Sequence, residues 1–140
     1  MHAAYDFEPG TWYHLAGTYD GKTMTVLVNG QPIGSQRFTG QIQIDDSDLM
    51  IGKGDPDYSM GEYFHGDIDE IRIWNVARSP EQLRAAMNGR LSGKEPGLVA
   101  YWPFDDGTAK DLSGNGNNGV FDGSARIVGV AKSQVPQPKP

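Results

Sequence analysis

The sequence contains no cysteine among its 140 residues, so disulfide frameworks, Cys-X-X-Cys metal sites and thiol catalysis are excluded. It also lacks any apolar run approaching the ~18 residues that a membrane-spanning helix needs. Residues 1–5 have neither the basic nor the apolar region of a signal peptide. If the protein is exported, its signal therefore lies outside this sequence.

Positive charge is scarce, with 12 Lys and Arg against 18 Asp and Glu, which gives a formal net charge of −6. A general affinity for nucleic acid is not expected, because phosphate binding needs a basic surface. An acidic surface suits cation binding, but it is also an ordinary source of solubility. Composition alone favours the second explanation.

Glycine and proline are abundant, at 19 and 9 residues, as in chains of short strands joined by many turns. Alternating apolar residues predict an antiparallel meander of three strands, joined by the turn signals Asp20-Gly21 and Asn29-Gly30. Its strands are expected at 12–19, 23–29 and 31–38. Further strands are expected at 49–52, 63–74 and 98–104, with two short ones at 120–121 and 125–130.

One short helix is predicted to begin after Ser79. Ser79 is a suitable N-cap, Pro80 suits the first helical position, and Gln82 completes a capping box. A narrow apolar stripe follows, and Gly89 is a natural C-terminal stop. The helix is too short to be a core element, so we expect it to cover one end of a β-sandwich.

Three segments together resemble a known family. They are WYHLAGTYDGKTMTVLVNGQPIG at 12–34, LMIGKG at 49–54 and FHGDIDEIRIWNVARSPEQLRAAM at 64–87. The combination is similar to the later half of laminin-G-like, concanavalin A-like lectin/glucanase domains. The resemblance implies an all-β fold, an antiparallel jelly-roll β-sandwich with one short helix. This domain would span 1–130, followed by a Pro-rich linker or disordered tail at 131–140.

The segment at 97–123, GLVAYWPFDDGTAKDLSGNGNNGVFDG, is also typical of this family, but it normally opens a domain. The usual earlier half is missing, so the chain resembles part of one domain joined to the opening strands of another, or a permuted domain. Missing strands would leave a sheet edge and an apolar face uncovered, and such surfaces recruit partners. We expect complementing strands from another chain or a homo-oligomer; a compact smaller sandwich is the alternative.

Catalysis is not expected. Glycosidases on this fold use two carboxylates on alternate residues of one strand, as in E-x-D-x-E. Here Asp67 and Asp69 share a face, but Ile71 occupies the last position, and Glu70 is expected to pair with Arg72 or a neighbouring strand. The three histidines, at positions 2, 14 and 65, show neither a triad pattern nor zinc-ligand spacing. His14 is predicted to be a semi-buried strand residue.

Calcium is the cofactor that the sequence suggests best, because hard cations bind several oxygens on a loop. The candidate metal ligands are Asp105, Asp106, Asp111, Asn115 and Asn117. A Gly- and Asn-rich loop built on Asx turns explains the same residues without a metal. The acidic loops at 45–48 and 55–57 are secondary candidates.

Carbohydrate binding would use exposed aromatic rings beside polar groups. The candidate ligand-binding residues are Asp55, Asp57, Tyr58 and Tyr63, with Phe64 next to them. The three tryptophans, at 12, 74 and 102, alternate with apolar residues and are expected in the core.

The sequence as a whole predicts a non-catalytic binding or adhesion module of a larger extracellular or cell-surface protein. Its ligand would be a glycan or another protein, with calcium as a structural ion. A structural spacer or oligomerisation module, or an accessory domain of a glycosidase, are the alternatives.

Overall fold

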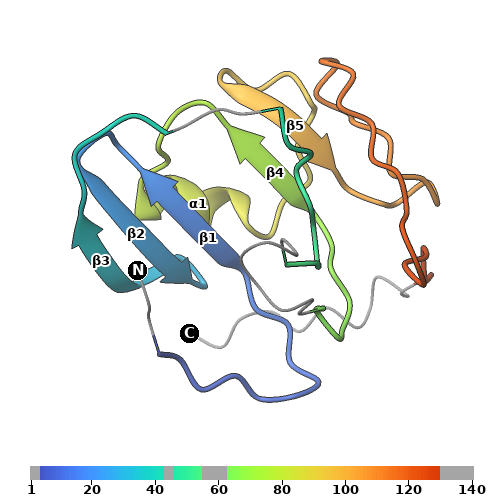
Figure 1. The fold of residues 1–140 in the computed structure, drawn as a ribbon, viewed down its shortest axis with the longest axis horizontal. Helices are drawn as coiled ribbons and strands as arrows, with labels where there is room; N and C mark the ends of the chain where they lie inside the picture. The colour runs from blue at the N-terminus through green and yellow to red at the C-terminus, as the bar shows by residue number, and fades with distance from the viewer. Residues whose placement is uncertain (1–3, 43–45, 55–62, 130–140) are drawn as a thin grey trace.

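The structure, a computed structural model, describes residues 4–42, 46–54 and 63–129. Within these ranges the chain forms two antiparallel sheets and one short helix (Figure 1). No helix there has the length and apolar character needed to cross a membrane. The tail predicted at 131–140 lies outside the described residues.

The first sheet is the predicted meander, with strands in the order β1 (Leu15–Tyr19), β2 (Thr23–Val28) and β3 (Gln31–Arg37). Asn29 and Gly30 both have positive φ, at 50° and 71°, as the tight turn between β2 and β3 requires. A bulge between Val26 and Leu27 shifts the register against β3. All three predicted strands are formed, but the first begins at Leu15 rather than at Trp12.

The second sheet pairs β4 (Ile71–Trp74) with β5 (Leu98–Trp102), so that Ile71 lies opposite Trp102. The long strand expected at 63–74 was wrong in length, because only its last four residues are a strand. Glu70 has φ 55°, a left-handed conformation that interrupts extended structure just before β4.

Three other expected strands, at 49–52, 120–121 and 125–130, are not formed in the described residues. At 49–52 the backbone makes no strand, and the nearby pairing is one isolated bridge between Lys53 and Tyr63. The described part of 120–130 also has no strand, since Ala125 N–H closes a turn on the Asp122 carbonyl and Val120 is 93% exposed.

Helix α1 (Pro80–Ala86) has the predicted capping box, with the Ser79 and Gln82 side chains bonded to each other's backbone N–H. It ends with Met87 as C-cap rather than at Gly89. In Figure 1 the helix lies behind β1, between the two sheets. Its Arg84 donates to the Gly30 carbonyl at 2.8 Å, so the helix fastens the turn between β2 and β3.

The core gathers around β5. The buried apolar residues are Leu27, Val28, Leu98, Ala100, Tyr101, Trp102 and Ala109. Trp102 thus lies in the core as predicted, whereas Trp12 and Trp74 are half-buried.

An ion pair joins β4 to the core. Glu70 and Arg72 lie 2.6 Å apart, a pairing that the sequence predicted, and Tyr101 donates its hydroxyl to the Glu70 carboxylate at 2.9 Å. Burial, together with this carboxylate, raises the pKa of Tyr101 to about 12. Arg72 also donates to the carbonyls of Ala86 and Gly89, which ties the helix end to the second sheet.

Candidate functional site

Tyr63 and Phe64, here called the aromatic pair, are consecutive exposed aromatic residues, with 61% and 57% of each residue accessible. The backbone holds both in place. Tyr63 is bridged to Lys53, and Phe64 N–H donates to the Gly52 carbonyl at 2.8 Å. Because the main chain is fixed by these contacts, the rings are presented to solvent by paired backbone rather than by a free loop.

Gly52 is required where this pairing occurs. Its φ of +75° is a left-handed conformation that disfavours a side chain. A Cβ there would also approach the Ile68 side chain to 3.3 Å, tighter than ordinary van der Waals contact. The glycine lets the 63–68 segment lie close against residues 51–53.

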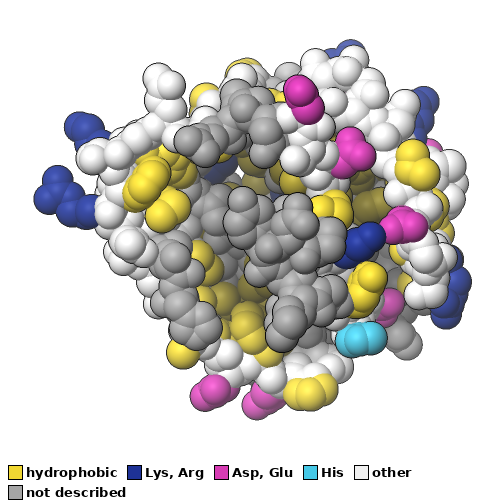
Figure 2. All heavy atoms as spheres, viewed as in Figure 1, with side chains coloured by type: hydrophobic (Ala, Val, Ile, Leu, Met, Phe, Trp, Pro, Cys, Tyr) yellow, Lys and Arg dark blue, Asp and Glu magenta, His cyan; other side chains and the backbone are white. Residues whose placement is uncertain are grey.

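Charged groups lie beside the aromatic pair. Lys53 Nζ is 3.1 Å from the Asp122 carboxylate, and this hydrogen bond raises the pKa of Lys53 and lowers the pKa of Asp122. Exposed ion pairs of this kind add little stability. They do give the surface a cationic donor and an anionic acceptor next to two rings. Figure 2 shows apolar and acidic side chains interspersed on this face.

Of the predicted ligand-binding residues, the structure places Tyr63 at this surface. Asp55, Asp57 and Tyr58 lie outside the described residues, as does the loop at 55–57 as a whole. Lys53 and Asp122 were missed from the sequence, because 69 residues separate them and no local pattern links them.

The predicted calcium loop is organised around Asp111, which is only 4% exposed. Its Oδ1 accepts the N–H groups of Tyr101 and Ser113, and its Oδ2 accepts the Asn117 N–H and the Ser113 hydroxyl, all at 2.8–3.0 Å. Burial acts to raise the pKa of Asp111, but these donors outweigh it and hold the pKa below its usual value.

The other candidate ligands are also engaged with protein groups. Asn115 and Asn117 both donate their side-chain amides to the Val99 carbonyl. Asp106 accepts the N–H and hydroxyl of Thr108, and Asp105 pairs with Arg90.

These contacts do not fit a calcium site in the arrangement described. Among the described residues no three acidic or histidine side chains converge, and the Asp111 oxygens already accept four hydrogen bonds. The geometry agrees with the alternative left open from the sequence, a loop of Asx turns. Calcium binding stays a prediction.

The carboxylates of the glycosidase-like motif lie in different surroundings. Asp67 is exposed, Asp69 accepts the Glu70 N–H at 2.9 Å, and Glu70 is held by Arg72. His14 is half-buried as predicted. Burial, and then the charge of Arg72, lower the pKa of His14.

An apolar hollow of about 350 Å³ opens on the outer face of the first sheet. Phe7, Leu15, Val26, Val28 and Ile33 line it, and Leu15 is 60% exposed. An apolar face without cover was a prediction from the sequence, and it stays a prediction.

The family model described as the concanavalin A-like lectin/glucanases superfamily matches residues 1–84. A crystal structure from Bacteroides ovatus, with a provisional assignment as a carbohydrate-binding protein, is 30% identical with a TM-score of 0.69. That match covers 81% of this chain and 35% of the other.

Three further relatives are longer than this chain. Residues 221–444 of an S-layer domain-containing protein from Clostridium thermocellum are 29% identical with a TM-score of 0.50, over 59% of this chain and 42% of that one. Pappalysin-1 of Mus musculus is 29% identical over 91 residues, and that of Homo sapiens is 26% identical over 96. The chain spans about 5% of the length of both pappalysins.

Proposed function

Because this chain belongs to the concanavalin A-like lectin/glucanases superfamily, we propose that it is a non-catalytic module that binds glycans through the surface of Tyr63 and Phe64. The observation that carries this proposal is the exposed aromatic pair, held by backbone bonds to residues 52 and 53. A large exposed apolar surface rimmed by polar groups marks a binding site more often than an isolated apolar residue does.

The chemistry of this surface suits a sugar. An aromatic ring provides a flat apolar face for the C–H groups of a pyranose, and its position is fixed by few rotatable bonds. Lys53 can donate to ligand hydroxyls, and Asp122 can accept from them. The likeness to the Bacteroides ovatus protein supports a carbohydrate as the ligand.

Absence of catalysis is the second part of the proposal. A retaining glycosidase needs two carboxyl groups about 5–5.5 Å apart, and an inverting one about 6.5–9.5 Å apart, across the scissile bond. Glu70 is committed to Arg72 and Tyr101, and Asp69 to a backbone N–H. These bonds support a structural role for both carboxylates.

We also propose that the module works outside the cell, as part of a larger protein. The relatives support this arrangement, since the chain matches a small part of the pappalysins and less than half of the S-layer domain-containing fragment.

The proposal is tested by screening the purified chain against immobilised glycans, together with Tyr63→Ala and Phe64→Ala. We expect the wild type to bind a restricted set and each variant to bind at least tenfold more weakly. Phe38→Ala is the matched control, because Phe38 is an exposed phenylalanine in a different part of the chain. No binding by the wild type would contradict the function. Unchanged binding by both variants would contradict the site.

A structural or oligomerisation role is the second candidate, and the apolar hollow around Leu15 favours it. In that role the hollow would receive strands from another polypeptide, as exposed sheet faces and edges do. The two roles are compatible, because the hollow and the aromatic pair are formed by different segments.

A further inference from the structure

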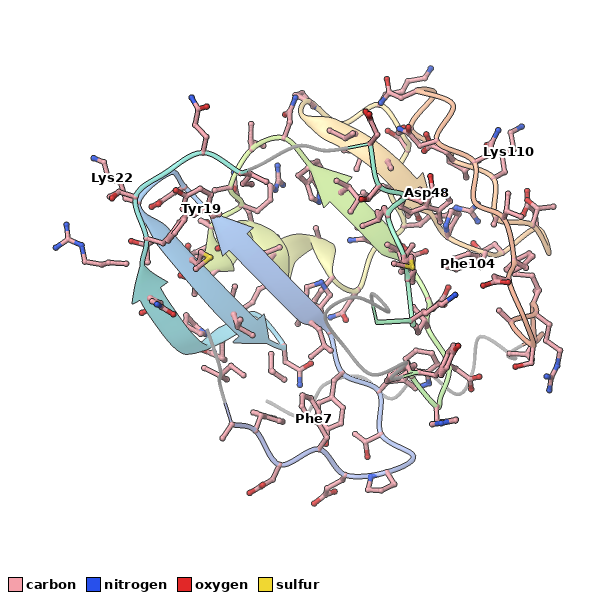
Figure 3. All side chains as sticks on the ribbon, viewed as in Figure 1. Phe7, Tyr19, Lys22, Asp48, Phe104 and Lys110 are labelled. Atoms are coloured by element: carbon pink, nitrogen blue, oxygen red, sulfur yellow. The ribbon has the colours of Figure 1, made fainter. Side chains whose placement is uncertain are left out.

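A second hollow, of about 290 Å³, lies at the far end of the first sheet. It is formed where the hairpin between β1 and β2 meets the residues preceding and beginning α1. Its lining consists of Thr18, Asp20, Thr23, Thr25, Ala77, Arg78, Ser79 and Pro80. Tyr19 and Lys22 mark this end of the sheet in Figure 3, whereas Phe7 of the apolar hollow lies at the opposite end.

Three threonines line this hollow. Thr18 pairs with Thr25 across the strands, and Thr23 begins β2 two residues earlier, on the same face of the sheet. None of these hydroxyls makes a side-chain hydrogen bond within the described residues. They are half-buried groups that retain both a donor and an acceptor for a ligand.

A carboxylate lies at the tip of the same hairpin. Asp20 Oδ1 accepts the N–H groups of Lys22 and Thr23 at 2.9 and 2.7 Å. These bonds hold the turn and lower the pKa of Asp20, so the group is ionised. Oδ2 takes no part in these two bonds, and Asp20 lines the hollow.

A guanidinium lies on the opposite wall. Arg78 lies over the ring of Trp74, 4.4 Å from its centroid, an arrangement that orients the planar group. It makes no ion pair within the part of the chain that the structure describes. Its N–H donors therefore remain available.

The combination of groups specifies the class of ligand. Hydroxyls, one anionic acceptor and one cationic donor suit a neutral molecule with neighbouring hydroxyls, since each ligand hydroxyl both donates and accepts. An anion would be attracted by Arg78 but repelled by Asp20. A volume of 290 Å³ is at the lower limit of small-molecule sites, which suits one monosaccharide unit.

We infer that the hollow between the β1–β2 hairpin and the start of α1 is a second saccharide site that takes a single sugar unit. It is separate from the aromatic pair on which the proposed function rests. The module would thus contact a glycan at two places, and two weak contacts on one chain raise the overall affinity.

The test is a titration of isotope-labelled protein with methyl α-glucoside, methyl α-galactoside and methyl α-mannoside, followed by amide and indole chemical shifts. We expect at least one sugar to shift the signals of Thr18, Thr25 and the Trp74 indole in a saturable manner. Inorganic phosphate, the probe for a simple anion site, is expected to leave them unchanged. Two results would overturn the inference: signals that shift with phosphate but with none of the sugars, and signals that shift with none of the added compounds.

Substitutions assign the site. Arg78→Ala is expected to weaken sugar binding at this hollow at least fivefold. Asp20→Asn should do the same, because it retains the Oδ1 acceptor of the turn while converting the second oxygen to a donor. Arg37→Ala is the matched control, since it removes the same charge from an exposed position. Equal sugar affinity in all three variants would overturn the inference. A spread of amide chemical shifts like that of the wild type shows that each variant is folded.

The same experiment separates this inference from the proposed function. Tyr63→Ala should leave the shifts at Thr18 and Thr25 intact. Sugar-dependent shifts confined to the region of Tyr63 would overturn the second site and leave the proposed function standing. Sugar-dependent shifts at the hairpin, with none near Tyr63, would support the second site and contradict the proposed binding surface at Tyr63.

Discussion

Asp111 attaches the loop from 105 to 119 to the core. Its carboxylate accepts four hydrogen bonds from β5 and from the following loop while almost fully buried. Removing such an acceptor leaves several buried donors without partners, and each unsatisfied group is costly. The loop from 105 to 119 thus depends on one side chain for its attachment to the core.

Asp111→Ala is therefore expected to lower the free energy of unfolding by about 3 kcal/mol. Urea denaturation followed by tryptophan fluorescence measures the change. Asp106→Ala is the control, because Asp106 forms a similar Asx turn at an exposed position, and it should have little effect. A loss for Asp111→Ala no larger than that of the control would contradict this account of the loop.

His14 is expected to make the protein sensitive to mild acid. Its pKa is lowered in the folded state, so the unfolded chain binds the proton more readily. The stability that neutral His14 contributes is present above the unfolded pKa of about 6.5 and is lost as the pH falls through the lower folded value. The free energy of unfolding should therefore decrease from pH 6.5 downward, before the carboxylates titrate.

Urea denaturation at several pH values between 7.5 and 5 measures this decrease. In His14→Gln the free energy of unfolding should depend much less on pH over this range. A variant of the exposed His65 should keep the pH dependence of the wild type. An identical slope in His14→Gln and wild type would show that another group is responsible.

At the scale of elements, three separate segments meet at Tyr101. Its hydroxyl donates to Glu70, next to β4, and accepts the Leu91 N–H, while Arg72 of β4 holds the end of α1. The network explains how a four-residue strand and a seven-residue helix are kept in place. Neither is long enough to be stable alone.

Tyr101→Phe removes this hydroxyl and keeps the ring. We expect it to lower the free energy of unfolding by about 1.5 kcal/mol, because the half-buried Glu70 carboxylate and a backbone N–H both lose a partner. Thermal and urea unfolding measure the loss. Tyr13→Phe provides the comparison, since the Tyr13 hydroxyl accepts a hydrogen bond from an exposed backbone group. Equal stability of the two variants would show that the network does not hold these elements together.

The elements that the sequence predicted well are those with local signals. The β1–β3 meander follows from two turn dipeptides and alternation, and α1 from its capping box. The strands expected at 49–52, 120–121 and 125–130 have apolar residues but no described neighbouring strand to pair with. The Lys53–Asp122 pair and the hollow beside Arg78 depend on segments brought together only by the fold, and no sequence pattern indicates them.

At the scale of the whole molecule, the described strands form one sheet of three and one of two. The hollow around Leu15 leaves apolar side chains of the larger sheet accessible to solvent. The sequence suggested that strands from another polypeptide complete the sandwich, and this remains a prediction.

Light scattering across a range of concentrations tests that prediction. We expect a mass larger than that of a single chain, and expect Leu15→Lys to reduce it toward one chain by placing a charge in the hollow. Ile42→Lys, at another exposed apolar position, is the control. A single-chain mass for the wild type at every concentration would mean that the fold closes without a partner.

The central claim is that the module binds carbohydrate without cleaving it. Its most direct test is co-sedimentation of the protein with a panel of insoluble polysaccharides, with reducing ends counted in the same tubes. The account predicts that protein moves to the pellet with at least one polysaccharide while the number of reducing ends stays constant. Protein that remains in solution with every polysaccharide, or reducing ends that increase with protein concentration, would contradict it.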